Sequence, residues 1–197
     1  MFAELLRSKL AGICELSDWQ VARLRQHYEL LTRWNRVLSL TSVRTLEEAV
    51  ERHYCECLFA ACHLPEDAPS IADIGSGAGF PGIPIAIMRQ GCPVVLIESH
   101  QRKAAFLKEA SRDLSNVRVL AKRAEAVAER YEWVVSRAVR YSDIARTLKK
   151  LGRNAELLTG EVRAADLGGF EWREPIQLPW GDRRHLWIGS NPAGCFT

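Results

Sequence analysis

The sequence lacks the features of several protein classes. No apolar run is long enough to cross a membrane, and the first residues do not have the regions of a signal peptide. We therefore expect a cytoplasmic protein with no membrane partner. The formal net charge is only +3 over 197 residues, which permits a nucleic-acid partner without requiring one.

The six cysteines follow no disulfide framework, which favours reduced thiols in a cytosolic protein. The alternative is a metal site built from His53, Cys55, Cys57, Cys62 and His63. However, that stretch is predicted to be helical, and residues two apart on a helix point to different sides. No second ligand pair with zinc-site spacing follows, so we expect no metal.

A glycine-rich turn is the main feature that the chain does have: Asp73-Ile74-Gly75-Ser76-Gly77-Ala78-Gly79-Phe80-Pro81-Gly82. The apolar stretch 70–72 predicts the end of a buried strand, and residues 81–88 predict the start of a helix. Glycines let a ligand approach the backbone, and a helix start presents unpaired N–H groups. The alternative is a tight turn between core elements, but four glycines in eight residues exceed what such a turn needs.

The spacing of the glycines narrows the class of ligand. A dinucleotide fingerprint would need glycine at Phe80, and the Gly-Lys-Ser/Thr of a phosphate-binding loop is missing. The turn begins instead with an acid, Asp73. A glycine cradle without phosphate-binding groups suits a nucleoside with an amino-acid tail, such as S-adenosylmethionine.

The pattern of the chain changes near Pro65 and Pro69. Residues 1–66 predict an N-terminal helical extension packed on the core, with helices over 2–10, from the capping box at Ser17 to about 33, and from the capping box at Thr45 to about 62. Residues 67–197 alternate between strand and helix, which predicts a parallel sheet covered on both faces. The predicted strands are 70–74, 93–98, 117–121, 132–136, 155–158, 170–178 and 185–189, the last two as an antiparallel pair; the predicted helices are 81–90, 100–114, 124–129 and 141–151.

Ligands bind beyond the carboxyl ends of parallel strands, so the residues that stand there are candidates for a site. Glu98 ends the second strand, where a carboxylate can accept from both ribose hydroxyls; alternatively it is a solvated acid. After the third strand, the backbone N–H of Ala124 or Glu125 could meet an adenine nitrogen and the Glu125 carboxylate its amino group. Glu125 is equally suited to cap the short helix that follows.

Arg137 follows the fourth strand, and an arginine that leaves a buried strand is unusual unless it is paired. Its partner could be the methionine carboxylate, the substrate or a structural acid such as Asp73. No nucleophile, base and acid stand in a catalytic arrangement. Methyl transfer from a sulfonium to a ring nitrogen with a free lone pair needs alignment and electrostatics, with no general base. Arg137 is therefore the predicted catalytic residue, acting by positioning.

The residues in this pattern resemble the bacterial small-subunit rRNA guanine-N7 methyltransferases, formerly called glucose-inhibited division protein B. The resemblance extends over about residues 30–188. Besides the turn with its Gly-Phe-Pro-Gly, the matching segments are Arg33-Trp34-Asn35 with Leu40-Thr41, Arg52-His53 with Leu58, 103–107, Arg123-Ala124-Glu125, Ser136-Arg137-Ala138 and Arg184-His185-Leu186.

This resemblance implies an α/β fold: the class I S-adenosylmethionine-dependent methyltransferase fold, a Rossmann-like seven-stranded sheet with an N-terminal helical extension. It implies S-adenosylmethionine as donor, N7 of a guanine in the 530 loop of 16S rRNA as acceptor, and 16S rRNA or the 30S subunit as partner of a monomer. The donor contacts implied by position are Gly75, Phe80, Ala124, Glu125 and Arg137. With Asp73, Gly77, Gly79 and Glu98 they make up the predicted donor site.

Four residues in three places depart from the pattern of that family. Ser39 replaces an asparagine, Glu56-Cys57 replaces Asp-Ser, and Thr159 replaces a lysine. If that lysine faces RNA, this chain lacks one phosphate contact. As a group, the basic residues expected to meet RNA can approach one rim of the site only if the extension folds toward the strand carboxyl ends. These residues are Arg33, Arg36, Arg44, Arg52, Arg123, Lys149, Lys150, Arg153, Arg183 and Arg184.

Two other functions fit the same sequence. A small-molecule methyltransferase on this fold would have a closed, apolar pocket instead of an open, positive mouth. A non-catalytic RNA-binding or ribosome assembly factor would bind the donor without transferring its methyl group.

Overall fold

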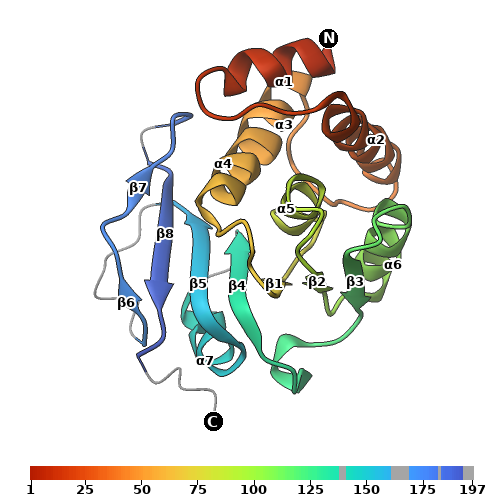
Figure 1. Cartoon of the computed structure of the whole chain (residues 1–197). Coiled ribbons are helices and arrows are strands. Elements are labelled where there is room, and N and C mark those ends of the chain that lie inside the picture. Colours follow the sequence, from red (N-terminus) through yellow and green to blue (C-terminus); the bar gives the residue numbers. More distant parts are fainter. Residues whose placement is uncertain (138–140, 161–168, 182, 193–197) are drawn as a thin grey trace.

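The computed structural model describes residues 1–137, 141–160, 169–181 and 183–192. Within these ranges, eight strands form one sheet in the order β3-β2-β1-β4-β5-β8-β6, and β7 also pairs with β8 (Figure 1). The first five strands are parallel, whereas β8 runs antiparallel to β5. Their bounds are β1 Ile71–Ile74, β2 Val94–Ile97, β3 Val117–Leu120, β4 Tyr131–Arg137, β5 Gly152–Thr159 and β8 His185–Ser190.

The predicted strand 170–178 is wrong as a single element, because it forms two short strands, β6 (Glu171–Trp172) and β7 (Ile176–Gln177). Trp172 pairs with Gly189, and Ile176 pairs with Leu186. Between these two pairs, the segment from β6 to β7 therefore has one residue more than the facing part of β8. An extra residue interrupts the ladder as a bulge does, and Pro175 beside it has no N–H to donate. The sheet therefore has eight strands among the described residues instead of the predicted seven.

Helices cover both faces of the sheet, as the alternating pattern predicts (Figure 1). Neighbouring residues of β1 belong to two separate buried clusters, Ile71 to one and Ala72 to the other. The first cluster includes residues of α5 (Gly82–Met88) and α6 (Gln101–Ala110), and the second includes residues of α7 (Tyr141–Leu151). The strand order reverses between β1 and β4, which opens a crevice at the carboxyl ends of these two strands.

The N-terminal third is helical and shares the first cluster with the sheet. Ser17 forms the predicted capping box with Gln20, and Thr45 caps the later helix by accepting from the backbone N–H of Glu48. The predicted helix after Thr45 is continuous, but its middle is a π-helix in which the Glu56 N–H bonds the Glu51 carbonyl. The bounds are α1 Phe2–Leu10, α2 Asp18–Trp34, α3 Leu46–Ala49, η1 Val50–Cys55 and α4 Glu56–His63.

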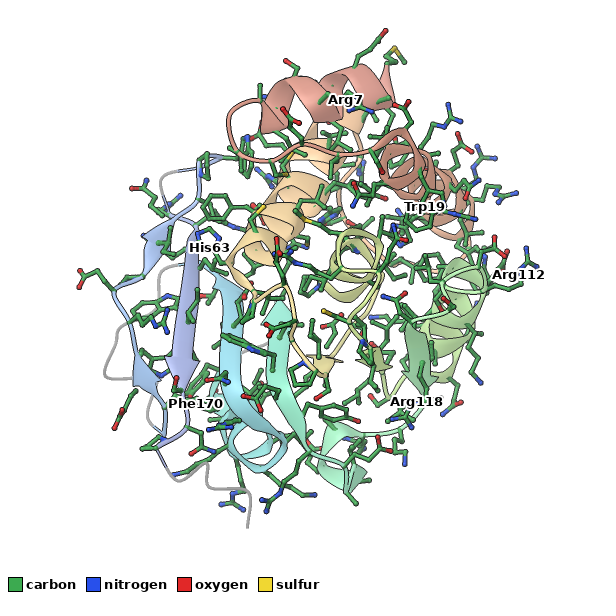
Figure 2. The ribbon with its side chains drawn as sticks, viewed as in Figure 1. Arg7, Trp19, His63, Arg112, Arg118 and Phe170 are labelled. Atoms are coloured by element: carbon green, nitrogen blue, oxygen red, sulfur yellow. The ribbon has the colours of Figure 1, made fainter. Side chains whose placement is uncertain are left out.

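The remaining helical segment, η2 (Ala124–Ala126), is a short 3-10 turn, shorter than the predicted 124–129. Of the helices that the structure describes, none is both long and apolar enough to cross a membrane. The side chain of Arg112 points outward from the fold (Figure 2).

Candidate functional site

The glycine-rich turn joins β1 to α5 at the crevice. Gly75, Gly77 and Gly79 adopt positive φ angles of 74°, 55° and 87°. At Gly77 a Cβ atom would meet no atom closer than the Gly75 carbonyl oxygen at 3.7 Å, so the space beside this backbone is open. The turn is held to the end of β2 because the Gly75 N–H donates to the Ile97 carbonyl over 2.9 Å. Bare backbone thus faces the crevice from a fixed position.

Asp73 lies beneath the turn and is fully buried. Its Oδ2 accepts from the Gly82 N–H at 3.0 Å, and its backbone carbonyl accepts from the Ser76 hydroxyl at 3.0 Å. Burial raises the pKa of this carboxyl to about 7. Asp73 is absent from the lining of the cleft, so its contacts hold the turn together from below.

A cleft of about 540 Å³ opens above the turn. Glu98 lines it and is 8% exposed. Its two carboxylate oxygens accept from the backbone N–H groups of Gly77 at 2.9 Å and His100 at 2.8 Å, so the acid is fixed against the turn. The described residues that line the cleft are Leu40, Thr41, Ser42, Val43, Arg52, His53, Gly75, Ser76, Gly77, Ala78, Phe80, Glu98, Lys103, Arg137 and Arg184.

Arg137 reaches the cleft from the end of β4 and contacts three groups of the helical extension. Its guanidinium donates to the Arg52 carbonyl at 2.7 Å, to His53 Nδ1 at 3.0 Å and to Glu56 Oε2 at 3.3 Å. Arg184 donates to the same Glu56 oxygen at 2.5 Å. Glu56 is fully buried, and burial raises its pKa although both arginines oppose the shift. Asp73, proposed above as a structural partner of Arg137, is replaced in that role by Glu56.

His53 forms part of the same wall of the cleft. Its ring stacks on Phe80 with 4.7 Å between centroids. Because a guanidinium only donates, Nδ1 must accept from Arg137, and Nε2 then carries the proton that it donates to the Thr41 hydroxyl at 2.7 Å. Burial, with the nearby Arg137 charge, lowers the pKa of His53 to about 3. The ring is therefore neutral, and both of its nitrogens are occupied.

His27 connects the extension to the glycine-rich turn from behind. It lies on the buried stripe of α2, where its Nε2 donates to the Ala78 carbonyl at 3.1 Å and its Nδ1 accepts from the Tyr54 hydroxyl at 2.9 Å. Burial lowers its pKa to about 4, which keeps the ring neutral near pH 7. The turn is thus held between β2 on one side and α2 on the other.

Comparison with known proteins assigns this arrangement to a family. The sequence profile of GidB, described as rRNA small subunit methyltransferase G, matches residues 20–160. The chain belongs to the small-subunit rRNA methyltransferase G family.

Relatives with that name agree over most of the chain. The protein from Nitrosospira multiformis is 41% identical over 157 residues, which are 78% of this chain and 70% of the relative. The protein from Nitrosomonas eutropha is 37% identical over 181 residues, 89% of this chain and 81% of the relative.

Solved structures of the same fold are those of class I methyltransferases. Magnesium protoporphyrin IX methyltransferase from Synechocystis PCC 6803, solved with bound S-adenosylmethionine, has a TM-score of 0.60 at 12% identity and covers 90% of this chain and 99% of that one. Aeropyrum pernix fibrillarin, also solved with that molecule bound, has a TM-score of 0.55 at 16% identity and covers 70% of this chain and 76% of that one. At these identities the comparison shows the fold: the chain has the predicted Rossmann-like class I fold.

The cleft brings together most of the predicted donor residues. Gly75, Gly77, Phe80, Glu98 and Arg137 line it. Gly79 does not line it, because a Cβ atom there would point at Ile83 and at His27 Nε2 instead.

The predicted donor residues of η2 lie apart from the cleft lining. Ala124 packs beside the second buried cluster, and the side chain of Glu125 is exposed. The Glu125 carbonyl accepts from Lys150 Nζ at 2.8 Å. Ala138, the last residue of the family-like segment Ser136-Arg137-Ala138, lies outside the described residues.

The basic residues expected at one rim divide into four groups in the structure. Arg52 and Arg184 line the cleft. Arg36 and Arg44 line a second cavity of about 250 Å³, which shares Thr41, Val43 and His53 with the cleft. Lys149, Lys150 and Arg153 stand at the other edge of the sheet, where α7 ends and β5 begins, and Arg33, Arg123 and Arg183 are exposed outside the cleft lining.

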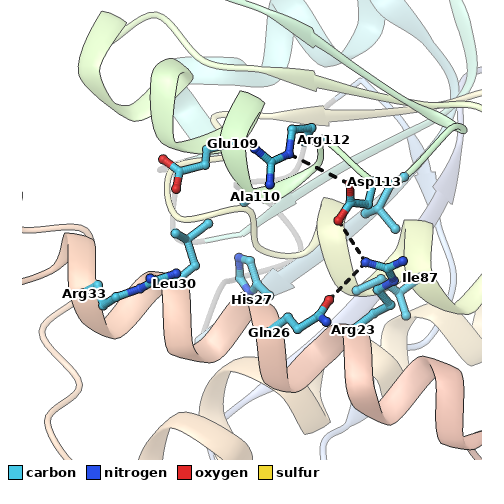
Figure 3. Close-up of a pocket in the computed structure, with 11 residues that line it drawn as sticks. Arg23, Gln26, His27, Leu30, Arg33, Ile87, Glu109, Ala110, Arg112 and Asp113 are labelled. Carbon is cyan, nitrogen blue, oxygen red and sulfur yellow. Dashed lines mark hydrogen bonds and ion pairs between the residues drawn. The ribbon is translucent and has the colours of Figure 1, made fainter.

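Arg33 borders a different pocket, which lies between α2 and α6 (Figure 3). Most charges there pair with one another: Arg23 donates to Gln26 and Asp113 at 3.0 Å each, and Arg112 approaches Asp113 at 3.9 Å. The Arg23–Asp113 pair ties α2 to the segment that follows α6. At the end of β5, the Thr159 hydroxyl donates to the Gly160 carbonyl at 2.8 Å.

Sequence reasoning missed Glu56, His53 and His27 as parts of the site. In the sequence, Glu56 stands out only as a departure from Asp in the family pattern, and His53 only as a motif residue and an unsuitable metal ligand. For His27 the available signal was a histidine on the apolar stripe of α2, three residues after Leu24.

Proposed function

We propose that this chain transfers the methyl group of S-adenosylmethionine to N7 of a guanine in the 530 loop of 16S rRNA. The observation that carries the proposal is the composition of the cleft: bare glycine backbone and Glu98 at the turn, with Arg52, Arg137 and Arg184 opposite. We further propose that it acts as a cytoplasmic monomer on 16S rRNA or the 30S subunit.

The residues at the turn fit S-adenosylmethionine. Gly75 and Gly77 offer uncovered backbone, and Glu98 offers oxygens whose remaining lone pairs can accept from ribose hydroxyls. The cleft volume of about 540 Å³ falls in the range of small-molecule sites. Arg137 is the lining cation suited to the methionine carboxylate. When bound, this donor supplies an electrophilic methyl carbon on a sulfonium.

The lining of the cleft supports positioning of the acceptor without a general base. His53 is neutral with both nitrogens engaged, and Glu98 is hydrogen-bonded through both oxygens. A purine N7 has a free lone pair and gives up no proton before attack, so this site needs only to align it with the donor. Arg52, Lys103 and Arg184 supply positive charge for phosphates around the acceptor. The choice of N7 and of the 530 loop rests on the family resemblance.

The polar lining favours RNA over a small apolar acceptor. A small-molecule enzyme would enclose its substrate among apolar side chains, whereas this cleft carries four basic residues: Arg52, Lys103, Arg137 and Arg184. The alternative is a non-catalytic assembly factor, and an activity assay distinguishes it from an enzyme.

The test is to incubate the protein and methyl-labelled S-adenosylmethionine with 30S subunits that lack the modification, and then to map the labelled base. We expect one labelled guanine, at N7, in the 530 loop. Label on another base would correct the acceptor. Donor binding without transfer to 30S subunits or 16S rRNA would support the assembly factor instead.

A further inference from the structure

The start of α4 brings a fully buried acid between two arginines of the cleft. Glu56 Oε2 accepts from Arg184 at 2.5 Å and from Arg137 at 3.3 Å. The three residues come from distant parts of the chain: the helical extension, the carboxyl end of β4, and the residue just before β8. The Glu56 side chain is 0% exposed, whereas those of Arg137 and Arg184 are 10% and 32% exposed. The acid therefore lies behind the cleft and the arginines lie in its wall.

We propose that Glu56 is a positioning residue for methyl transfer, which holds Arg137 and Arg184 in the orientation that the acceptor RNA and the donor require. This inference rests on the proposed function. One carboxylate shared by two guanidinium groups leaves one positive charge in excess. That charge faces the cleft, because Arg137 and Arg184 line the cleft and Glu56 does not.

The contacts around Arg137 support this role. The π-helical turn before Glu56 presents the Arg52 carbonyl and His53 Nδ1 to the same guanidinium. Together with Glu56 they fix it through three acceptors from one helical segment. A side chain held this way loses little freedom when a ligand binds, so its charge is oriented beforehand.

Stability alone is a weak reason to bury this cluster. Taking charged groups out of water costs free energy, and their mutual attraction often does no more than offset that cost. Apolar packing of similar volume is commonly as stable. Here Glu56 Oε1 and the Nε groups of both arginines are buried without a hydrogen-bond partner among the described residues. An arrangement that leaves three such atoms unpaired is better explained by the orientation of the two guanidinium groups in the cleft.

The experiment compares Glu56→Gln and Glu56→Asp with a matched control, Glu51→Gln. Glu51 lies on the same helical segment and pairs with Lys9 at 2.8 Å, away from the cleft lining. The measurements are kcat and KM on 30S subunits, the donor Kd by calorimetry, and thermal unfolding. We expect Glu56→Gln to lower kcat/KM at least 10-fold with the donor still bound, Glu56→Asp to recover activity to within 3-fold of wild type, and Glu51→Gln to match wild type. Activity of Glu56→Gln within 2-fold of wild type overturns the inference.

A second pair of variants keeps the test decisive if Glu56→Gln does not fold. Arg184→Met retains the Glu56–Arg137 pair, and Glu56→Met/Arg184→Met replaces the buried acid and its partly exposed partner by apolar groups. With both proteins assayed below their unfolding temperatures, we expect the double variant to be at least 10-fold less active than Arg184→Met. Equal activities overturn the inference while leaving the proposed function intact. A wild-type protein that does not methylate 30S subunits overturns the proposed function first, and the inference with it.

Discussion

At the scale of single residues, the space around Gly82 sets how closely α5 approaches the sheet. A Cβ atom there would collide with Leu96 Cδ2 and would lie 2.7 Å from Asp73 Oδ2 and 2.9 Å from Asp73 Cβ. The Gly82 N–H also donates to Asp73. Since the first turn of α5 fixes the end of the glycine-rich turn, any added atom displaces both.

Gly82→Ala should therefore destabilise the fold by about 1–3 kcal/mol, the usual cost of overpacking a core. The matched control is Gly91→Ala, because a Cβ at Gly91 meets nothing within 4 Å. That control should change stability by less than about 0.5 kcal/mol. Urea unfolding measures both, and equal effects would show that the crowding at Gly82 relaxes at no cost.

Glu98→Ala should weaken binding of S-adenosylmethionine at least 10-fold. The change removes the acceptors of the Gly77 and His100 N–H groups together with the proposed ribose contact. Glu98→Gln keeps one acceptor oxygen and should lose less affinity. Calorimetry gives both values, and an unchanged Kd in the alanine variant removes Glu98 from the donor site.

Some residues of the candidate site could be predicted from the local sequence pattern, and others could not. Gly77, Glu98 and Arg137 could be predicted because each lies at or just after the carboxyl end of a buried strand, and parallel strands end at a common edge. Glu56 could not, because its burial depends on Arg137 and Arg184, 81 and 128 positions away. Asp73 was predicted in the donor site because it begins the motif, yet its carboxylate faces the N–H of Gly82.

At the scale of elements, β5 carries an unpaired acid in the middle of the sheet. Glu156 is 2% exposed, and neither carboxylate oxygen has a hydrogen-bond partner among the described residues. Burial raises its pKa well above the ordinary value. Between the ordinary and the raised pKa the folded chain keeps a proton that the unfolded chain releases, so this group lowers stability as the pH rises through that window.

Glu156→Leu should accordingly stabilise the protein at pH 8 by about 1–3 kcal/mol, with a smaller gain at pH 5. Glu156→Gln should remove the same pH dependence without the added apolar packing. Urea unfolding of the three proteins at both pH values tests this. A gain that is equal at pH 5 and pH 8 would contradict a raised pKa. Neither change touches the cleft lining, so donor affinity should stay at the wild-type value.

Most elements follow from periodicity and punctuation, since the helix caps at Ser17 and Thr45 and the apolar strands act locally. Two irregular features of the backbone could not be predicted in this way. The π-helix η1 places His53 and Glu56 toward Arg137, and its wider turn leaves no mark in the apolar spacing. The bulge between β6 and β7 depends on pairing with β8, which a single segment does not reveal.

At the scale of the whole molecule, some basic side chains are neutralised by acids and others are not. Away from the cleft, Arg23 pairs with Asp113 and Arg118 with Glu129. At the cleft, Arg52 and Lys103 have no carboxylate partner among the described residues. Unneutralised cations at the mouth of a site attract phosphates, so the surface around the cleft is the proposed RNA-binding face.

Methylation of RNA should therefore weaken steeply with added salt, because binding releases counterions. Arg52→Ala should reduce the slope of log(kcat/KM) against log[salt] by about 1, as expected for the loss of one phosphate contact. Arg118→Ala is the control, since this exposed arginine lies on β3 and already pairs with Glu129. An Arg52 variant with the wild-type slope would remove this residue from the RNA interface.

The hydrogen bond from His27 to the Ala78 carbonyl limits the modularity of this protein. The glycine-rich turn is supported from behind by α2, so removing the N-terminal helices should destabilise the turn. A catalytic half transplanted onto another RNA-recognition module would have to carry α2 with it. Functional divergence in this lineage is thus expected through surface substitutions on the helices, with the extension itself retained.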